Sequence, residues 1–131
     1  MGLSVLDSSV IIAFRDSTDR HHAASVSLLK ETAASDALVV PVIVYAEVLV
    51  GAIRKGRSQA ATAERFFREA TRLEPVTPEI ARTAARIRAQ HGVRLPDALV
   101  IATGVELEAD QILTADSRWK RVDPRVRVIG E

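Results

Sequence analysis

Short apolar runs recur along this chain, and longer segments with apolar residues at helical spacing separate them. Each run is only a few residues long and is bounded by turn or capping residues. Runs of this length and composition are expected to form buried strands. The pattern predicts five strands, at residues 3–6, 37–40, 73–76, 111–113 and 126–129.

Helices are expected in the intervals between these strands. Asp7 and the two serines after it give a helix start, and Asp19 is expected to cap a second helix. Thr77 and Pro78 combine a capping residue with a proline at the first helical position, and Gly92 ends that helix. The predicted helices cover residues 8–15, about 19–35, 42–55, 58–72, 78–91 and 96–109, with a turn or short helix at 115–121.

The segment 42–55 fits two descriptions. It begins with Val-Ile-Val-Tyr, which is rich in residues that favour strands. It is long for a strand, however, and Ala46, Glu47 and Leu49 suit a helix that ends at Gly56. We therefore expect a helix here.

Strands that alternate with helices predict the α/β fold class. We expect an α/β/α sandwich around a central, mainly parallel sheet of about five short strands. The 131 residues are enough for one domain with a proper core, so we expect a single domain over residues 1–131.

Composition narrows the function classes. The chain has 18 basic and 17 acidic residues, so net charge gives no reason to expect nucleic-acid binding, and such a partner would need a local basic patch. Cysteine is absent, which excludes disulfides, thiol nucleophiles and cysteine-ligated metal sites.

Nothing in the sequence indicates a membrane or an export signal. The N-terminus lacks a basic region before an apolar core, unlike a signal peptide. The longest apolar run, residues 38–53, is interrupted by Pro41 and Glu47 and is shorter than the roughly 20 residues of a membrane span. A cytoplasmic protein without membrane contact is the expectation.

Two acidic residues follow predicted strands. Asp7 comes after the first strand and Asp116 after the fourth. In a parallel sheet the carboxyl ends of all strands meet at one edge, where ligands bind, so these acids are expected to approach each other. Helix capping explains either acid alone equally well.

Two further acids can reach the same edge. Glu47 interrupts a strongly apolar segment, where an unpaired charge would be costly to bury. Asp97 lies in the first turn of its helix, where the helix dipole favours a carboxylate. Four converging carboxylates would repel one another, and Mg²⁺ or Mn²⁺ would relieve that repulsion. Such a site favours hydrolysis of phosphodiesters, because the cation holds a phosphate oxygen and activates water.

Basic residues near these acids are candidates for contacts with phosphate. Arg15 ends the first helix, and Arg54 and Lys55 end the helix that carries Glu47. Arg118 follows Asp116, with Lys120 and Arg121 beyond it, and offers a second possible contact. A solvated helix end favoured by the dipole is the simpler explanation of any one of them.

Four short motifs, each with one acidic residue, follow one another along the chain: Leu-Asp-Ser-Ser-Val (residues 6–10), Tyr-Ala-Glu-Val (45–48), Leu-Pro-Asp-Ala-Leu-Val-Ile-Ala (95–102) and Leu-Thr-Ala-Asp-Ser-Arg-Trp (113–119). Together they resemble PIN-domain proteins, and more narrowly the VapC ribonuclease toxins of type II toxin–antitoxin systems. The resemblance spans the chain from Asp7 to Trp119. Each motif is short, so their order and spacing carry the specificity.

The resemblance implies a Mg²⁺- or Mn²⁺-dependent endoribonuclease. It also implies a homodimer neutralised by a cognate VapB antitoxin. By position, the acidic quartet of the family falls on Asp7, Glu47, Asp97 and Asp116. Ser9 matches a supporting hydroxyl residue, Thr114 matches a hydroxyl residue that orients the last acid, and Trp119 takes a packing position commonly held by Phe.

Other interpretations of the function remain open. A PIN-domain nuclease that processes RNA or acts on DNA, without being a toxin, would carry the same acids. A non-enzymatic α/β binding module such as a receiver domain fits less well, because Asp7 is followed by Ser8 rather than a second acid. A phosphatase of the haloacid dehalogenase type requires Asp two residues after the first, where Ser9 stands.

Overall fold

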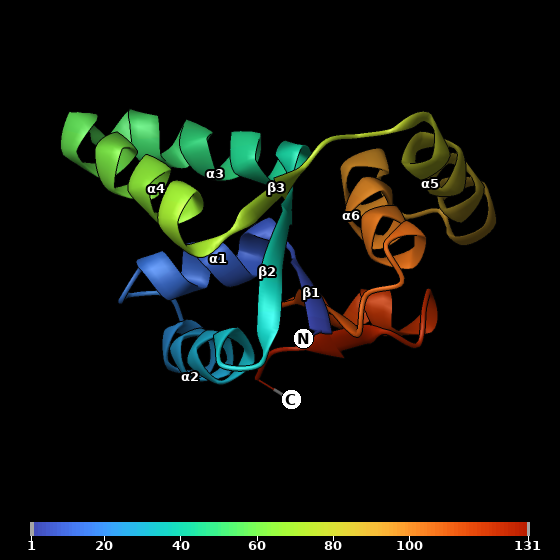
Figure 1. Ribbon diagram of the computed structural model, residues 1–131, viewed down its shortest axis with the longest axis horizontal. Helices are drawn as coiled ribbons and strands as arrows, with labels where there is room; N and C mark the ends of the chain where they lie inside the picture. Colours follow the sequence, from blue (N-terminus) through green and yellow to red (C-terminus); the bar gives the residue numbers. More distant parts are fainter. Residues whose placement is uncertain (1, 131) are drawn as a thin grey trace.

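A parallel five-stranded sheet forms the middle of the structure, a computed structural model that describes residues 2–130 (Figure 1). Its order is β3-β2-β1-β4-β5, and each neighbouring pair is parallel. The fold class predicted from the sequence is confirmed, and every strand lies within two residues of its predicted bounds. The strands are β1 (Gly2–Leu6), β2 (Asp36–Pro41), β3 (Arg72–Glu74), β4 (Gln111–Thr114) and β5 (Val126–Val128).

Six α-helices and one 3₁₀ helix connect the strands in the described part of the chain. The ambiguous segment is helical over its full length, as predicted, because one face of the helix packs on the core while the other meets solvent. The helices are α1 (Ser8–Arg15), α2 (His22–Ala33), α3 (Val42–Lys55), α4 (Arg57–Ala70), α5 (Pro78–His91), α6 (Leu95–Glu106) and η1 (Ser117–Arg121).

Two predicted helix boundaries were wrong. Asp19 does not cap α2; its carboxylate accepts a hydrogen bond from the His21 N–H (2.8 Å) in the turn before the helix. The helix α6 ends at Glu106 rather than near Ala109, because Glu108 adopts a left-handed backbone with φ of 52°. Asp and Glu can serve a turn as well as a helix, so sequence alone did not decide these ends.

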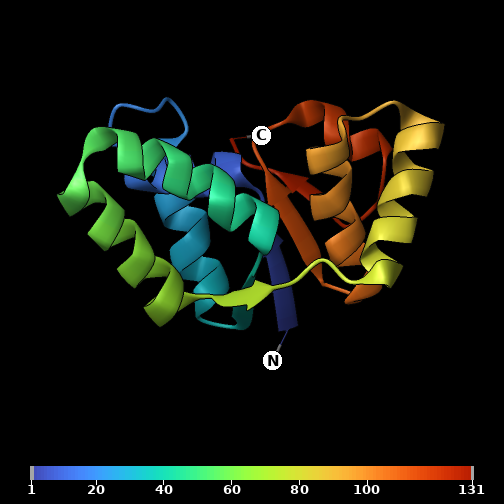
Figure 2. The ribbon, with the colours of Figure 1, turned by 90° about the horizontal axis from the view of Figure 1, so that it is seen from above.

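The helices cover the sheet on two sides. Figure 2 shows α1 to α4 on one side of the sheet and α5 and α6 on the other. The strand β2 pairs with one edge of β1, and β4 pairs with the opposite edge of β1. The strand order therefore reverses between β1 and β4, and a crevice for ligands forms at the carboxyl ends of strands at such a point.

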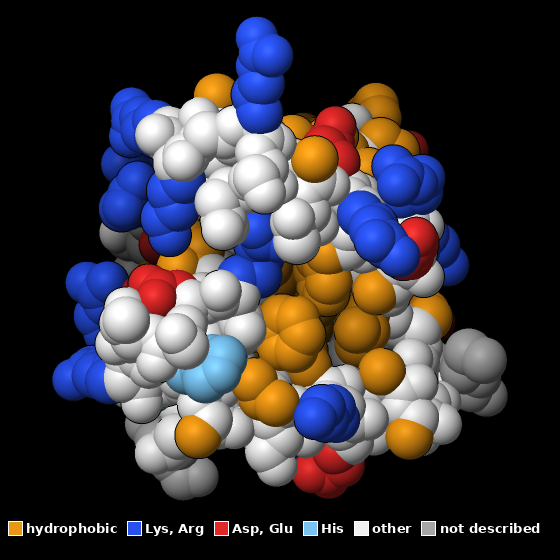
Figure 3. Space-filling view, turned by 90° about the vertical axis from the view of Figure 1, so that its left-hand side faces the viewer, with side chains coloured by type: hydrophobic (Ala, Val, Ile, Leu, Met, Phe, Trp, Pro, Cys, Tyr) orange, Lys and Arg blue, Asp and Glu red, His pale blue; other side chains and the backbone are white. Residues whose placement is uncertain are grey.

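An open groove runs between α1 and α4. Phe14 and Phe66 form its apolar floor, with ring centroids 5.5 Å apart. Figure 3 views the side of the molecule where the ends of these helices lie, and hydrophobic side chains gather there in a hollow bordered by Lys and Arg. The other lining residues are Arg15, Gln59, Thr62, Arg65 and Glu69.

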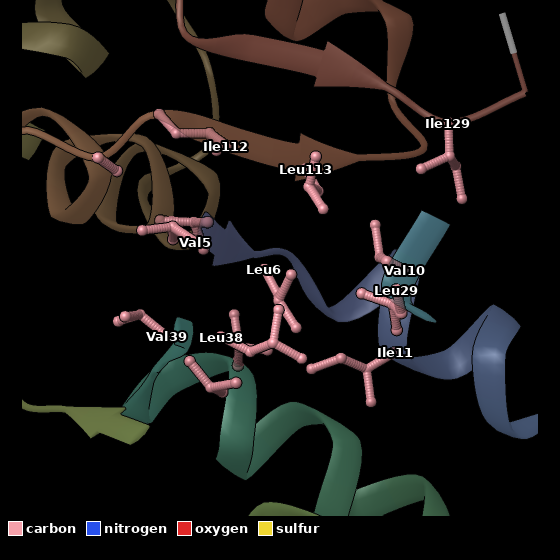
Figure 4. Packing of buried hydrophobic residues seen from close by; sticks show 14 of the residues in the cluster. Val5, Leu6, Val10, Ile11, Leu29, Leu38, Val39, Ile112, Leu113 and Ile129 are labelled. Carbon is pink, nitrogen blue, oxygen red and sulfur yellow. The ribbon is translucent and has the colours of Figure 1, made fainter. Parts of the chain in front are cut away.

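Buried aliphatic side chains from the strands and from α1 fill the main core (Figure 4). Leu6 and Leu113 are fully buried on β1 and β4, and Val10 and Ile11 of α1 pack against the same cluster. This packing fixes the start of α1 against the carboxyl ends of β1 and β4.

A close approach fixes α6 against β4. A Cβ atom built on Gly104 would lie 2.4 Å from both Cγ1 and Cδ1 of Ile112, so only glycine fits at this contact. Ala98 and Ala102 on the same helix pack against Ile80 and Ala84 of α5. The two contacts together set the position of the first turn of α6 relative to the sheet.

Among the described residues, no helix is both long enough and apolar enough to cross a membrane.

Candidate metal centre

Asp7 and Asp116 lie next to each other at the carboxyl edge of the sheet. Leu6 of β1 pairs with Leu113 of β4, and the Asp7 N–H donates to the Leu113 carbonyl (2.9 Å). Asp7 caps α1 and Asp116 caps η1. The capping role considered from the sequence is therefore real, and it holds both acids at the point where the strand order reverses.

Three hydrogen bonds hold the buried carboxylate of Asp7. Oδ1 accepts from the Ser8 N–H (2.8 Å), and Oδ2 accepts from the hydroxyls of Ser9 (2.7 Å) and Thr114 (2.8 Å). Burial raises the pKa of Asp7 above its usual value; these hydrogen bonds oppose the rise, and Asp116 adds to it. Hydrogen bonds thus fix the carboxyl in place, and no cation among residues 2–130 pairs with it.

Ser9 and Thr114 join the ends of β1 and β4. The Ser9 hydroxyl accepts from the Ala115 N–H (3.0 Å), and the Thr114 hydroxyl accepts from the Asp116 N–H (3.1 Å). The family resemblance implied that Thr114 orients Asp116. Its hydroxyl accepts from the backbone N–H of Asp116 and also donates to the carboxylate of Asp7.

Asp116 has a cationic partner. Arg118 donates from Nε to Oδ1 (3.0 Å) and from Nη2 to Oδ2 (2.7 Å), and its backbone N–H also donates to Oδ1 (3.0 Å). The hydrogen bonds from Arg118 lower the pKa of Asp116 below its usual value. Asp116 therefore stays ionised in the same site where the pKa of Asp7 is raised.

Glu47 on α3 and Asp97 in the first turn of α6 complete the set. Burial, together with repulsion from Asp7, raises the pKa of each of these carboxyls, whereas the charge of Arg94 lowers it. Glu47 and Asp97 also repel each other, and Asp116 repels Asp97. Four acids from distant parts of the chain thus share one electrostatic environment.

The burial expected for Glu47 from its apolar neighbours is only partial. The helix α3 turns the residue toward solvent while Val44 and Val48 pack inward, and the burial that remains still raises the pKa of its carboxyl. The placement of Glu47 beside Asp7 and Asp97 follows from the helix position and not from a buried charge.

The donor set suits a hard divalent cation. All four side chains offer carboxylate oxygens, the ligands that Mg²⁺ and Mn²⁺ prefer, and mutual repulsion adds to burial in raising the pKa of Asp7, Glu47 and Asp97. Within residues 2–130, however, no three His, Asp or Glu side chains already form a compact ligand cluster. The carboxylates are neighbours without being drawn together into a ligand shell.

The predicted basic residues lie in different surroundings. Arg15 donates to Gln59 and lines a small hollow beside Glu47, together with Lys55 and Asp16. Arg54 is exposed at the end of α3. Arg118 lies against Asp116.

Arg94 is a site residue that reasoning from the sequence missed. It occupies the N-cap position of α6, and its charge acts on both Glu47 and Asp97. A cation at the positive end of a helix is unfavourable, so its position was a usable signal that the residue serves something other than the helix. Ser8 was missed as well; its hydroxyl favours ionised Glu47.

Comparison with known proteins agrees with this architecture. The family profile described as PIN domain matches residues 4–124. No curated protein matches the chain in sequence.

Solved structures share the fold at low sequence identity. VapBC2 from Rickettsia felis bound to a promoter DNA fragment has a TM-score of 0.80 at 14% identity, covering 97% of this chain and 98% of that one. A toxin–antitoxin complex from Klebsiella pneumoniae has a TM-score of 0.80 at 19% identity, with 95% and 96% covered. The sarcin–ricin loop cleaving toxin VapC20 of Mycobacterium tuberculosis has a TM-score of 0.74 at 19% identity, with 90% and 93% covered.

Proposed function

This chain belongs to the PIN-domain family, and on that premise we propose that it is a metal-dependent endoribonuclease toxin of the VapC type. The observation that supports the proposal is the mutual repulsion among Asp7, Glu47, Asp97 and Asp116, which adds to burial in raising three of their pKa values. Neighbouring carboxylates at a strand-order reversal suit hydrolysis of a phosphodiester through a divalent cation.

Each residue of the site has a part in this chemistry. Asp7, Glu47, Asp97 and Asp116 would hold Mg²⁺ or Mn²⁺, which supplies Lewis acidity and offsets the charge that develops on the phosphate during hydrolysis. Ser9 and Thr114 fix the direction of the Asp7 carboxylate through their hydroxyls. Arg118 keeps Asp116 ionised and ready to act as a ligand.

Similar structures support the toxin assignment. Those structures include VapBC complexes and a toxin described as cleaving the sarcin–ricin loop. Their identity to this chain is at most 20%, which supports the shared fold and leaves substrate and partner as proposals.

We also propose a VapB-type antitoxin as the partner. The groove between α1 and α4, with Phe14 and Phe66 on its floor, offers an apolar surface that a segment of the antitoxin would cover. Phe66→Asp is expected to prevent co-purification with the antitoxin, whereas Val76→Asp, outside the groove, retains it. Co-purification of both variants would remove the groove from the proposal. A homodimer remains a prediction, which sedimentation would test.

A PIN-domain nuclease that is not a toxin would use the same acids. Growth arrest on expression, relieved by the product of a short neighbouring gene, separates the toxin from a processing or DNA-directed enzyme. Normal growth together with metal-dependent cleavage would favour the second.

The test of the nuclease is cleavage of a total-RNA pool by purified protein without antitoxin. It is carried out with Mg²⁺, with Mn²⁺ and with chelator, beside Asp97→Asn prepared in the same way. We expect discrete fragments that require metal and disappear in the variant. Fragments of equal yield from Asp97→Asn would contradict the proposed site.

A further inference from the structure

Two hollows flank the acidic residues, and their charges differ. The hollow beside Glu47 is lined by Arg15 and Lys55 but also by Asp16, so its two cations face two acids. The hollow on the opposite side is lined by three arginines, Arg94, Arg118 and Arg121, and by Asp97 and Asp116. Arginine outnumbers carboxylate only in the second hollow, so that hollow is the better place for an anion.

The three arginines come from separate elements and converge on this second hollow. Arg94 precedes α6, whereas Arg118 and Arg121 belong to η1. The Arg121 guanidinium is tied to the fold through Nη2, which donates to the His91 carbonyl (3.1 Å). The remaining lining residues are Gly92, Val93 and the buried Trp119, and the hollow encloses about 100 Å³.

The hydrogen bonds of these arginines leave donors available. Within residues 2–130, the side chain of Arg94 makes no hydrogen bond, although its charge acts on Glu47 and Asp97. Arg118 uses Nε and Nη2 toward Asp116, and its side chain is 78% exposed. A guanidinium has five N–H donors in a planar fork that matches phosphate oxygens, so unused donors remain on all three.

We propose that the hollow lined by Arg94, Arg118 and Arg121 is a phosphate subsite, which binds a backbone phosphate of single-stranded RNA beside the acidic residues. This inference rests on the proposed function for the identity of the ligand. It also predicts the path of the RNA strand over the surface. The phosphate next to the acidic residues lies toward η1 and the start of α6, and not toward Lys55.

The subsite also explains why a cation stands at the start of α6. Arg94 is unfavourable toward the helix dipole, and although its charge attracts Glu47 and Asp97, its side chain makes no hydrogen bond with residues 2–130. When Arg94 binds a phosphate, its positive charge offsets the negative charges of both Asp97 and the phosphate. Asp97 and Asp116 line the same hollow, so the bound phosphate adjoins the carboxylates that act on the neighbouring bond.

The test is binding of a fluorescein-labelled single-stranded RNA, followed by anisotropy at several salt concentrations, in chelator and again in Ca²⁺. Arg94→Gln is expected to weaken binding roughly threefold or more and to lower the salt slope by about 0.7, the loss of one phosphate contact. Arg121→Gln is expected to act in the same way, and Arg94→Lys to retain most of the affinity.

Two controls carry the same change of charge. Arg82 is exposed on α5 and Arg68 is exposed on α4, and neither lines the hollow. Arg82→Gln and Arg68→Gln are expected to bind RNA nearly as the wild type does. An effect of either control equal to that of Arg94→Gln would overturn the proposal, because the overall positive charge, and not a defined site, would then hold the strand.

The remaining outcomes separate this proposal from the nuclease itself. Wild-type affinity in Arg94→Gln, or no measurable RNA binding by the wild type in either condition, would overturn the subsite even if the protein cleaves RNA. Weakened binding in Arg94→Gln without cleavage in any metal would keep the subsite and remove the nuclease.

Discussion

Asp7 is the acid that the fold holds most firmly. The residue is only 7% exposed, and its carboxylate accepts hydrogen bonds from two side-chain hydroxyls, those of Ser9 after β1 and Thr114 on β4. Partners of a metal ligand that fix its direction affect metal affinity and rate nearly as strongly as the ligand itself. Thr114 is therefore the most informative residue beyond the quartet.

Thr114→Val keeps the shape of the side chain but removes its hydroxyl. We expect activity to fall about 10- to 100-fold, the usual effect of losing such a partner. The pKa of Asp7 should rise further, because its ionised form loses a hydrogen bond, so the acidic limb of the pH–rate profile should move to higher pH. The pH–rate profile of RNA cleavage measures both effects.

Thr114→Ser is the matched control. Serine keeps a hydroxyl at the same position, so activity and pH profile should stay close to those of the wild type. A profile for Thr114→Val that overlays the wild-type profile would show that the hydroxyl does not act through Asp7.

The raised pKa of Asp97 links stability to pH. Near neutral pH the ionised carboxylate costs the folded state free energy, because burial and Asp7 disfavour its charge. As the pH falls through the folded pKa, protonation removes that cost. Asp97→Asn in chelator should therefore be more stable than wild type near pH 7 by up to about 1 kcal/mol, the range for partly exposed charges.

That gain should shrink on acidification, since the wild type then becomes neutral at this position too. Urea unfolding at a series of pH values measures the difference. A gain that stays constant down to pH values where the carboxyl is protonated would contradict the linkage.

The sequence predicted that the four acids lie near one another, but not all of the reasons for it. Asp7 and Asp116 could be placed because strand ends are readable from apolar runs and parallel strands share an edge. Glu47 was argued from burial, which the structure shows to be only partial. Arg94 was missed because its effect on Glu47 and Asp97 requires α3 and the start of α6 to be neighbours in space.

At the scale of elements, the contact between α6 and β4 sets the position of Asp97. Gly104→Ala should lower the free energy of unfolding by roughly 1–3 kcal/mol, as overpacking does in a filled core, because the new methyl group would meet the fully buried Ile112. Gly51→Ala is the opposite case. No atom lies within 4 Å of its added Cβ, so alanine should stabilise α3 by about 0.5–1 kcal/mol.

Urea unfolding of the two variants compares the same substitution in two helices. Equal effects of the same sign would show that helix propensity, and not the contact with Ile112, decides the stability of α6.

Element types were more predictable than element ends. Thr77 and Gly92 mark the limits of α5 because each performs a local task, one capping the N-terminus and the other adopting φ of 69°. The end of α6 depends instead on Glu108, a residue type that gives no local sign of a left-handed turn.

At the scale of the whole molecule, the strand order brings the acids together. Asp7 and Asp116 are 109 positions apart in the chain, yet β1 and β4 are direct neighbours. Apolar runs predict that strands exist, whereas the order β3-β2-β1-β4-β5 depends on which helices pack on which side. The net charge of +1 agrees with this view, because any anion must be bound by a local arrangement such as the three arginines.

The central claim is that four carboxylates from four parts of the fold together form one binding site for a divalent cation. Calorimetric titration of Mn²⁺ into the wild type, Asp7→Asn, Glu47→Gln, Asp97→Asn and Asp116→Asn tests it most directly, with Asp123→Asn as control, because Asp123 pairs with Arg125 outside the site. We expect binding to the wild type and the control, and a loss of about tenfold or more in each of the four variants. Equal affinity in the wild type and the four variants, or no binding to any of them, would contradict the claim.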